Sequence, residues 1–159
     1  MQTKKRLKQK ITDLSQTTSE VRLNAINKQQ SHQHCMVCGS HSLLGLKINF
    51  YSDQYHHAWA LFKGNSHQQG YQGILHGGFL SVLLDGAMCQ VVFNKNIEAV
   101  TADMNIRFLH EVPINSELLI KAEVISNYFI LYKVKAEIYV GNKLMVKADA
   151  RFMKKAIKK

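Results

Sequence analysis

The chain has 159 residues, of which 46% are apolar, so it is expected to form one globular domain with a buried core. Its net charge of +10 lies at the ends: residues 1–10 and 151–159 carry five Lys or Arg each, and residues 11–150 balance to zero. This predicts solvated basic tails rather than the basic stripe of a nucleic-acid-binding protein, and no apolar stretch reaches the roughly 20 residues of a membrane span.

Residues 1–30 are predicted to form a basic helical extension of a domain that occupies residues 31–159. A helical stripe with alternating spacings of four and three residues runs through Leu7, Ile11, Leu14, Thr18, Val21 and Ala25. Because the stripe holds few large apolar side chains, we expect the helix to pack on its own domain or on a dimer partner.

Residues 32–41 combine histidines with a Cys-x-x-Cys pair, Cys35 and Cys38. Such residues can supply a tetrahedral zinc site, but no second ligand pair follows at the usual distance. We therefore favour a structural turn and predict no metal ligand, with zinc binding and redox chemistry as the alternatives. An odd cysteine count, three, and a basic N-terminus without the apolar segment of a secretory signal predict a reduced, cytoplasmic protein.

The remaining sequence predicts strands around one helix. Apolar and polar residues alternate, as in half-buried strands, over residues 46–50, 56–62, 100–108, 120–124, 130–140 and 144–152. Gly141-Asn142 indicates a two-residue hairpin. Residues 79–93 form an apolar run that predicts a helix buried on all sides. The predicted fold is of the α+β class: a curved antiparallel sheet of five to six strands wrapped around one long central helix.

One charged side chain, Asp85, interrupts that apolar run. An interior carboxylate is costly to desolvate unless it is paired or works in a pocket, so Asp85 indicates an active site. Ser81 and Cys89 lie four residues before and after Asp85 and therefore share its stripe of the helix. They either border the pocket or pack against the sheet.

The sequence resembles the hotdog-fold acyl-CoA thioesterases of the phenylacetate-pathway type. The likeness lies in Cys35–Gly39 with Leu44–Leu46, in Gly70–Gly78 with its His-Gly-Gly, in the helix to Asp85, and in Thr101–Leu109. It departs at Gly86, where an acidic residue is common, and at Gln72 and Glu111, where proline is expected. The resemblance implies hydrolysis of acyl-CoA thioesters to free acid and CoA, and a fold of the hotdog type. It implies no cofactor other than the CoA of the substrate.

The residues of the predicted site can be given roles in this chemistry. The backbone N–H groups of Gly77 and Gly78 at the helix start would polarise the thioester carbonyl. Asp85 would be the general base, or the nucleophile that forms an anhydride. The resemblance implies a hydroxyl at Thr101 that helps to hold the water, although strict alternation puts Thr101 opposite the apolar face of its strand. His76 either holds the loop by hydrogen bonds or takes part in catalysis.

The substrate contacts are predicted from the same segments. They are Gly78, Gly70, Gln72, Met88, Cys89 and Phe79, with Phe108 in the apolar acyl slot and Arg107 or Arg151 near the coenzyme phosphates.

A helix rise of 1.5 Å per residue puts Asp85 about 13 Å from His76, so one chain cannot place both helix regions on one thioester carbon. Two antiparallel helices across a two-fold axis can, which predicts a homodimer with composite sites. The resemblance implies that such dimers often pair into tetramers. Two other functions compete: an acyl hydratase or dehydratase on the same fold, and a non-catalytic acyl-CoA-binding module.

Overall fold

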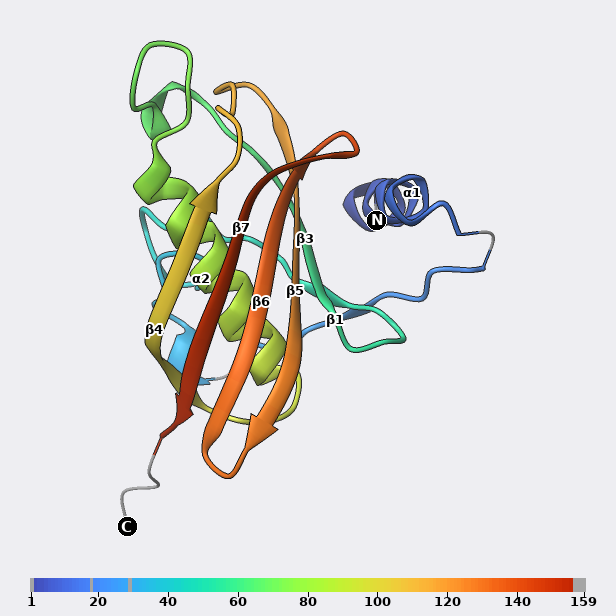
Figure 1. Ribbon diagram of the computed structural model, residues 1–159, viewed down its shortest axis with the longest axis vertical. Helices are drawn as coiled ribbons and strands as arrows, with labels where there is room; N and C mark the ends of the chain where they lie inside the picture. The colour runs from blue at the N-terminus through green and yellow to red at the C-terminus, as the bar shows by residue number, and fades with distance from the viewer. Residues whose placement is uncertain (1, 18, 29, 156–159) are drawn as a thin grey trace.

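The computed structural model describes residues 2–17, 19–28 and 30–155 and forms one antiparallel sheet with a helix on each face (Figure 1). The helices are α1 (Gln2–Ser15) and α2 (Gly77–Phe93), and two short 3-10 turns are η1 (Gln30–His32) and η2 (Ser66–Gln68). The strands are β1 (Asn24–Ala25), β2 (Tyr51–Ser52), β3 (Ala58–Lys63), β4 (Ala99–Phe108), β5 (Glu117–Tyr128), β6 (Leu131–Val140) and β7 (Lys143–Lys154). No helix of these residues is long and apolar enough to cross a membrane.

The sheet has the order β1-β2-β3-β5-β6-β7-β4, so β4 lies at an edge and pairs only with β7. The predicted hairpin at Gly141-Asn142 is confirmed, because Val140 pairs with Lys143 and Gly141 has φ 58°, a value that glycine adopts at little cost. The α+β class and the hotdog arrangement are confirmed. The sheet has seven strands instead of five to six, because the two-residue strands β1 and β2 extend its other edge.

The long strands curve around α2, which fills the inner side of the sheet (Figure 1). Its buried residues are Leu80, Leu83, Leu84, Gly86, Ala87, Met88, Gln90, Val91, Val92 and Phe93. They cover most of the circumference of the helix, as its apolar sequence predicts, and the remaining side carries the partly buried Ser81, Asp85 and Cys89. Each fully buried leucine stabilises the fold by about 1.5–3 kcal/mol.

Residues 46–50 do not form the predicted strand. Lys47 has φ 51°, a left-handed conformation that breaks the pleat at the middle of the segment. The N–H of Ile48 donates to the carbonyl of Val37 at 2.9 Å, so this segment supports the cysteine-containing turn instead of a neighbouring strand.

The N-terminal helix is also shorter than predicted. It ends at Ser15, after which Gln16 has φ 49°, and Ala25 lies in β1 instead of in the helix. Thr18, the middle of the expected stripe, lies outside the described residues. The helix packs on its own domain, as expected, in an apolar cluster of Leu7, Ile11, Val21, Leu23, Trp59 and Leu119.

Where the structure describes them, the basic ends belong to α1 and β7 instead of to irregular tails, and most of their Lys and Arg side chains are exposed, as predicted. Arg6 and Lys10 of α1 both contact the carboxylate of Glu117 on β5, at 2.7 and 2.9 Å. At the other end, residues 151–154 belong to β7, and Arg151 forms an ion pair with Asp103. Residues 156–159 lie outside the described residues.

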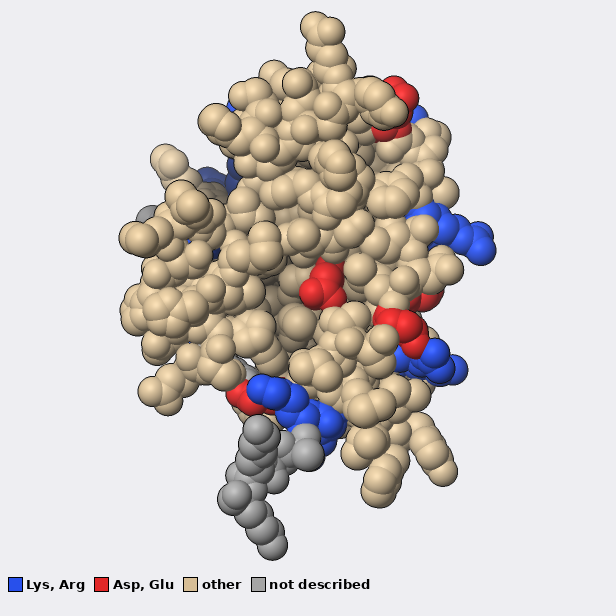
Figure 2. All heavy atoms as spheres, turned by 90° about the vertical axis from the view of Figure 1, so that its left-hand side faces the viewer, with Lys and Arg blue, Asp and Glu red and all other residues tan. Residues whose placement is uncertain are grey.

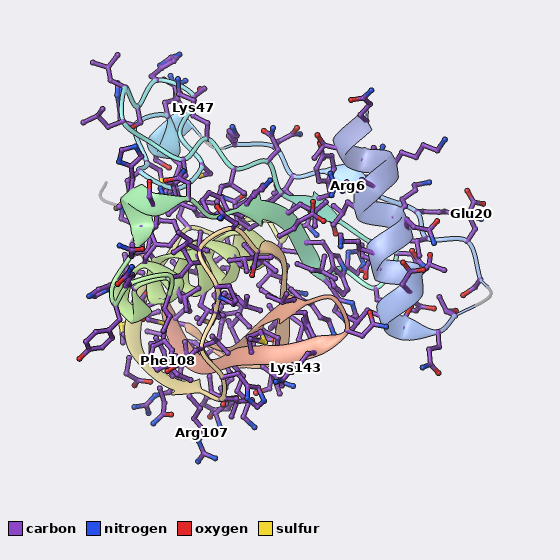
Figure 3. All side chains as sticks on the ribbon, turned by 90° about the horizontal axis from the view of Figure 1, so that it is seen from above. Arg6, Glu20, Lys47, Arg107, Phe108 and Lys143 are labelled. Atoms are coloured by element: carbon purple, nitrogen blue, oxygen red, sulfur yellow. The ribbon has the colours of Figure 1, made fainter. Side chains whose placement is uncertain are left out.

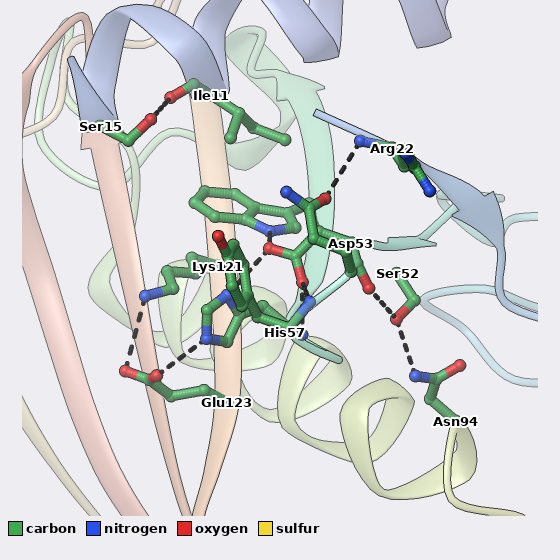
Figure 4. A network of polar contacts seen from close by, with 12 residues as sticks. Ile11, Ser15, Arg22, Ser52, Asp53, His57, Asn94, Lys121 and Glu123 are labelled. Carbon is green, nitrogen blue, oxygen red and sulfur yellow. Dashed lines mark hydrogen bonds and ion pairs between the residues drawn. The ribbon is translucent and has the colours of Figure 1, made fainter. Parts of the chain in front are cut away.

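A buried carboxylate organises the outer face of the sheet beside α1 (Figure 4). The Asp53 Oδ2 accepts hydrogen bonds from the Trp59 indole N–H and from the His57 ring, both at 2.8 Å. The other ring nitrogen of His57 lies 3.2 Å from Glu123. Burial alone would raise the pKa of Asp53, but the hydrogen bonds from His57 and Trp59 outweigh it and hold this pKa below its ordinary value.

Candidate active site

The first turn of α2 presents an uncommitted backbone donor at Gly77. The Nδ1 of His76, the N-cap residue, accepts a hydrogen bond from the Gly78 N–H at 2.9 Å. The Gly77 N–H finds no acceptor within the part of the chain that the structure describes. With the positive end of the helix dipole behind it, this N–H can bind a carbonyl oxygen.

The loop before α2 approaches His76 closely at Gly70. A Cβ on Gly70 would lie 3.1 Å from the His76 Cα, and the Gly70 N–H donates to the carbonyl of Ile74 at 2.9 Å. Gly73 has φ 79°, and Gln72 lies exposed beside it. The loop therefore fixes His76, whereas the exposed side chain of Gln72 forms no hydrogen bond with the described residues.

A hollow of about 380 Å³ lies at the start of α2, next to the Gly77 N–H. The Phe108 ring forms part of its wall, only 3.4 Å from where a Gly77 Cβ would lie. Figure 3 shows Phe108 beside α2, whereas Arg107 points away from the body of the protein. The Arg107 side chain is exposed to solvent. Arg151, the other cation expected near coenzyme phosphates, instead donates a hydrogen bond to Asp103.

Asp85 is half-buried on α2 and forms no ion pair with any of the described residues. The Thr101 hydroxyl donates to its Oδ1 at 2.6 Å, which orients the carboxylate. Thr101 itself is exposed, so the carboxylate is open to solvent along the edge strand β4. An oriented carboxylate without a cationic partner is available for proton transfer or nucleophilic attack.

The Thr101–Asp85 contact depends on an irregularity that strict alternation misses. The register of β4 against β7 shifts between Thr101 and Asp103, which leaves Ala102 as the additional residue of a bulge. Thr101 pairs with the buried Phe152, so its side chain faces α2, and Asp103 pairs with Arg151 on the outer side. The expectation that Thr101 lies opposite the apolar face is therefore wrong.

A cavity of about 330 Å³ lies beside Asp85. Ser81, Asp85 and Cys89 all line it, as their spacing of four residues predicts for one stripe of a helix. Its other walls are Met104 on β4 and the turn with Cys35 and Cys38, together with His32, Met36, Val37, Val82, Gly86 and Gln90. Most of this wall is apolar, which suits an acyl group.

Two residues expected at the acyl group lie elsewhere. Met88 is fully buried in the core, and Phe79 packs against Phe62 with 5.4 Å between ring centroids. Neither lines the cavity beside Asp85. Met104 lines the cavity instead. The alternating sequence of residues 100–108 already placed Met104 on the apolar face of its strand, and this pattern could have predicted its position.

The cavity wall contains all three cysteines of the chain, and none is in a disulfide. Burial, and to a smaller extent the charge of Asp85, raises the pKa of the Cys89 thiol to about 12. Cys89 is therefore protonated near neutral pH and does not compete with Asp85 as a nucleophile. Cys35 and Cys38 lie together with His32, within 4.8 Å of one another at their ligand atoms.

One protein-family model matches part of the chain. Residues 72–127, which include the helix start, Asp85 and Thr101, match the sequence model of the thioesterase superfamily. No curated protein matches the chain.

Solved structures resemble the fold at low sequence identity. A thioesterase superfamily protein, RHA08564, matches with a TM-score of 0.73 and 17% identity, over 96% of this chain and 77% of its own. The Escherichia coli PaaI protein of the phenylacetic acid degradation operon matches with a TM-score of 0.65 and 20% identity, over 70% of this chain and 81% of its own. A hypothetical thioesterase from Streptococcus pneumoniae, in a structure with coenzyme A, matches with a TM-score of 0.61 and 22% identity, over 65% of this chain and 84% of its own.

The resemblance to the thioesterase superfamily is therefore confirmed, in the sequence of residues 72–127 and in the hotdog fold of the chain, and with it the expected class of enzyme, a thioester hydrolase.

Proposed function

We propose that the protein hydrolyses acyl-CoA thioesters as a homodimer, at two sites that each combine Gly77 of one subunit with Asp85 of the other. The observation that carries this proposal is that the two halves of the site lie apart in one chain. The hollow at Gly77 and the cavity at Asp85 have no lining residue in common. Eight residues of helix separate Gly77 from Asp85, which amounts to about 12 Å.

The edge strand β4 supports a two-fold assembly at this face. Its outer backbone edge is unpaired among the described residues, and Val100 and Phe108 are each about half exposed. Leu109 and Met153 add exposed apolar surface nearby. Figure 2 shows that the middle of this face carries few charged side chains. An exposed edge strand with apolar side chains is a surface that proteins normally cover.

In the proposed reaction, the Gly77 N–H donates to the thioester carbonyl oxygen and stabilises the negative charge that develops there. Asp85, oriented by Thr101, either removes a proton from the attacking water or attacks the carbonyl carbon itself. The CoA thiol has a pKa near 8.5 and can leave as a thiolate with little acid catalysis. These groups perform the chemistry without a cofactor.

Two of the related structures support this choice of residues and substrate. The pneumococcal thioesterase has been crystallised with one aspartate and with one threonine replaced by alanine, and these positions are 16 residues apart in that chain. Asp85 and Thr101 have the same separation here. The same pneumococcal protein binds coenzyme A, which supports CoA over a carrier protein as the thiol carrier of our proposal. Three free cysteines fit a reducing, cytoplasmic location.

The test is a thiol-release assay over a panel of acyl-CoA substrates with three variants. Asp85→Asn keeps the shape of the side chain, and removal of a general base lowers kcat about 10²–10⁴-fold. Gly77→Pro removes only the N–H at the first helical position, where proline is well tolerated. Loss of one such donor lowers kcat about 10²–10³-fold. Gly77→Ala keeps the N–H, adds a Cβ at the same place against Phe108, and serves as the matched control.

Mixing the two inactive variants tests the composite site. A heterodimer of Gly77→Pro with Asp85→Asn has one site with both groups intact, so activity returns when the subunits exchange. Sites within single chains would recover nothing. Unchanged rates in Asp85→Asn, or loss of an enoyl-CoA absorbance without thiol release, would refute the hydrolase proposal.

A further inference from the structure

Three side chains that bind soft metal ions converge in the wall of the cavity. His32 comes from η1, and Cys35 and Cys38 come from the turn that follows it. Their ligand atoms lie within 4.8 Å of one another, and the Cys38 Sγ is 3.8 Å from the His32 Nδ1. Within the described residues this is the one group of three or more His, Cys, Asp or Glu side chains with such an arrangement.

The distances fit tetrahedral zinc. With Zn–S near 2.3 Å and Zn–N near 2.0–2.1 Å, ligand atoms at tetrahedral angles are about 3.6–3.8 Å apart. The Cys38 to His32 distance already has this value, and the limit of 4.8 Å for the others is within about 1 Å of it. Small side-chain rotations are enough to complete the geometry.

Both sulfur atoms receive hydrogen bonds of the kind that support metal thiolates. The Val37 N–H donates to the Cys35 Sγ at 3.4 Å. The amide of Gln90, which is 2% exposed, donates to the Cys38 Sγ at 3.2 Å. N–H groups that donate to ligand atoms orient them and stabilise their charge. Buried amides normally donate to oxygen acceptors, and a thiol sulfur is a weaker acceptor than a thiolate bound to a metal ion.

The backbone holds the ligands in place before any ion binds. The Gly39 N–H donates to the Cys35 carbonyl at 2.8 Å, and the Cys35 N–H donates to the His32 carbonyl at 3.1 Å. A Cβ on Gly39 would lie 2.5 Å from backbone atoms of Cys35, so the turn requires glycine. The His32 ring is fixed edge-on against Phe93, at 4.4 Å between centroids. A preformed site binds its ion with little ordering cost.

We propose that His32, Cys35 and Cys38 bind one Zn²⁺ ion, with a fourth coordination position that opens into the cavity beside Asp85. All three ligands line that cavity, so a water molecule or a thiol entering it can complete the coordination. The ion joins η1 to the turn that follows it, and Gln90 of α2 donates to one of its ligands, so that one wall of the cavity is fixed. This proposal is independent of the proposed hydrolase activity.

The test is metal binding by the full chain, reduced and stripped of metal. Titration with Co²⁺ is expected to produce thiolate-to-cobalt charge-transfer bands that saturate at about one ion per chain and disappear when Zn²⁺ is added. Cys38→Ser and His32→Ala are expected to lose these bands. The matched controls, Cys89→Ser in the same cavity wall and His34→Ala two residues from His32, are expected to keep them. Gln90→Leu is expected to weaken Zn²⁺ binding about 10–100-fold.

A second measurement needs no variant and so does not depend on how variants fold. Zn²⁺ is expected to protect Cys35 and Cys38 from alkylation in the wild-type chain, as read by mass spectrometry, and to leave the rate at Cys89 unchanged. The absence of charge-transfer bands in the folded wild type, or equal protection of all three cysteines by Zn²⁺, would each overturn the proposal.

Discussion

Replacement of Gly86 by alanine tests how closely the cysteine-containing turn packs on α2. A Cβ on Gly86 would lie 2.6 Å from the Val37 Cγ1, and 3.2 and 3.3 Å from its Cβ and Cγ2. A contact below 3.0 Å forces a displacement. Val37 is buried, and its N–H and its carbonyl are both hydrogen-bonded, to the Cys35 Sγ and to the Ile48 N–H. The turn therefore has little freedom to yield.

The net effect follows from two opposing contributions. Alanine in place of glycine stabilises a helix interior by about 1 kcal/mol. Overpacking of a core costs about 1–3 kcal/mol, and the upper end applies here because the obstacle is anchored at both of its backbone polar groups. We expect Gly86→Ala to lower the free energy of unfolding by about 2 kcal/mol, the difference between the two.

The effect of Gly86→Ala on the free energy of unfolding is expected to vanish or change sign when the Val37 side chain is shortened. Val37→Ala deletes both methyl groups and leaves its Cβ, 3.2 Å from the new atom, as the nearest contact. In that background Gly86→Ala is expected to be neutral or to stabilise by up to about 1 kcal/mol. Urea unfolding of the four proteins, followed by the fluorescence of the single tryptophan, Trp59, completes the double-mutant cycle. Equal destabilisation in both backgrounds would refute the reasoning, because Val37 would not be the obstacle.

Three further predictions concern single side chains. Thr101→Val removes the donor to Asp85 and is expected to lower kcat about 10–100-fold, while Thr101→Ser restores it; an unchanged kcat in the valine variant would exclude a positioning role. His76→Ala is expected to lower Tm by about 2–4 °C through loss of the cap on Gly78, and His76→Ser, which also caps, is expected to recover both Tm and kcat; kcat that stays low in the serine variant would instead make His76 catalytic. The pKa of Asp53 is lowered in the fold, so its contribution to stability is present near neutral pH and is lost as pH falls through that lowered pKa. Asp53→Asn is expected to destabilise most at neutral pH and least in acid, whereas a constant difference between the two proteins in urea unfolding across this range would contradict the assignment.

Regular periodicity made most of the fold predictable. The apolar run from Phe79 to Phe93 gave α2 almost to the residue, and alternation located β3 through β7. Two of the departures from prediction each trace to a single backbone irregularity. Lys47 and Gln16 adopt left-handed conformations, which end a strand and a helix that the side-chain pattern continues. Lysine and glutamine rarely adopt the left-handed conformation, so neither residue predicts it from the sequence.

The residues of the candidate site on α2 could be predicted from the sequence, but the segment that forms the opposite wall of the cavity could not. Spacing placed Asp85 with Ser81 and Cys89 on one stripe, and all three line the cavity. The opposite wall is formed by the turn at Cys35 and Cys38, about fifty residues away in sequence. Pairing of two such distant segments depends on the close approach of Val37 to Gly86, and no local pattern encodes that contact.

The bulge at Ala102 connects the proposed dimer with the proposed chemistry. Without it, Thr101 would share the outer face of β4 with Arg107, and Asp85 would lose its hydroxyl partner. The bulge shifts the strand by one residue, so that Thr101 turns inward while the remainder of β4 continues to alternate. Strand β4 is also the free edge at which the second subunit is proposed to pair. Its position would therefore depend both on β7 within the chain and on the partner subunit. A subunit contact that moves β4 would therefore move the hydroxyl that orients Asp85, and activity would depend on assembly through Thr101 as well as through Gly77.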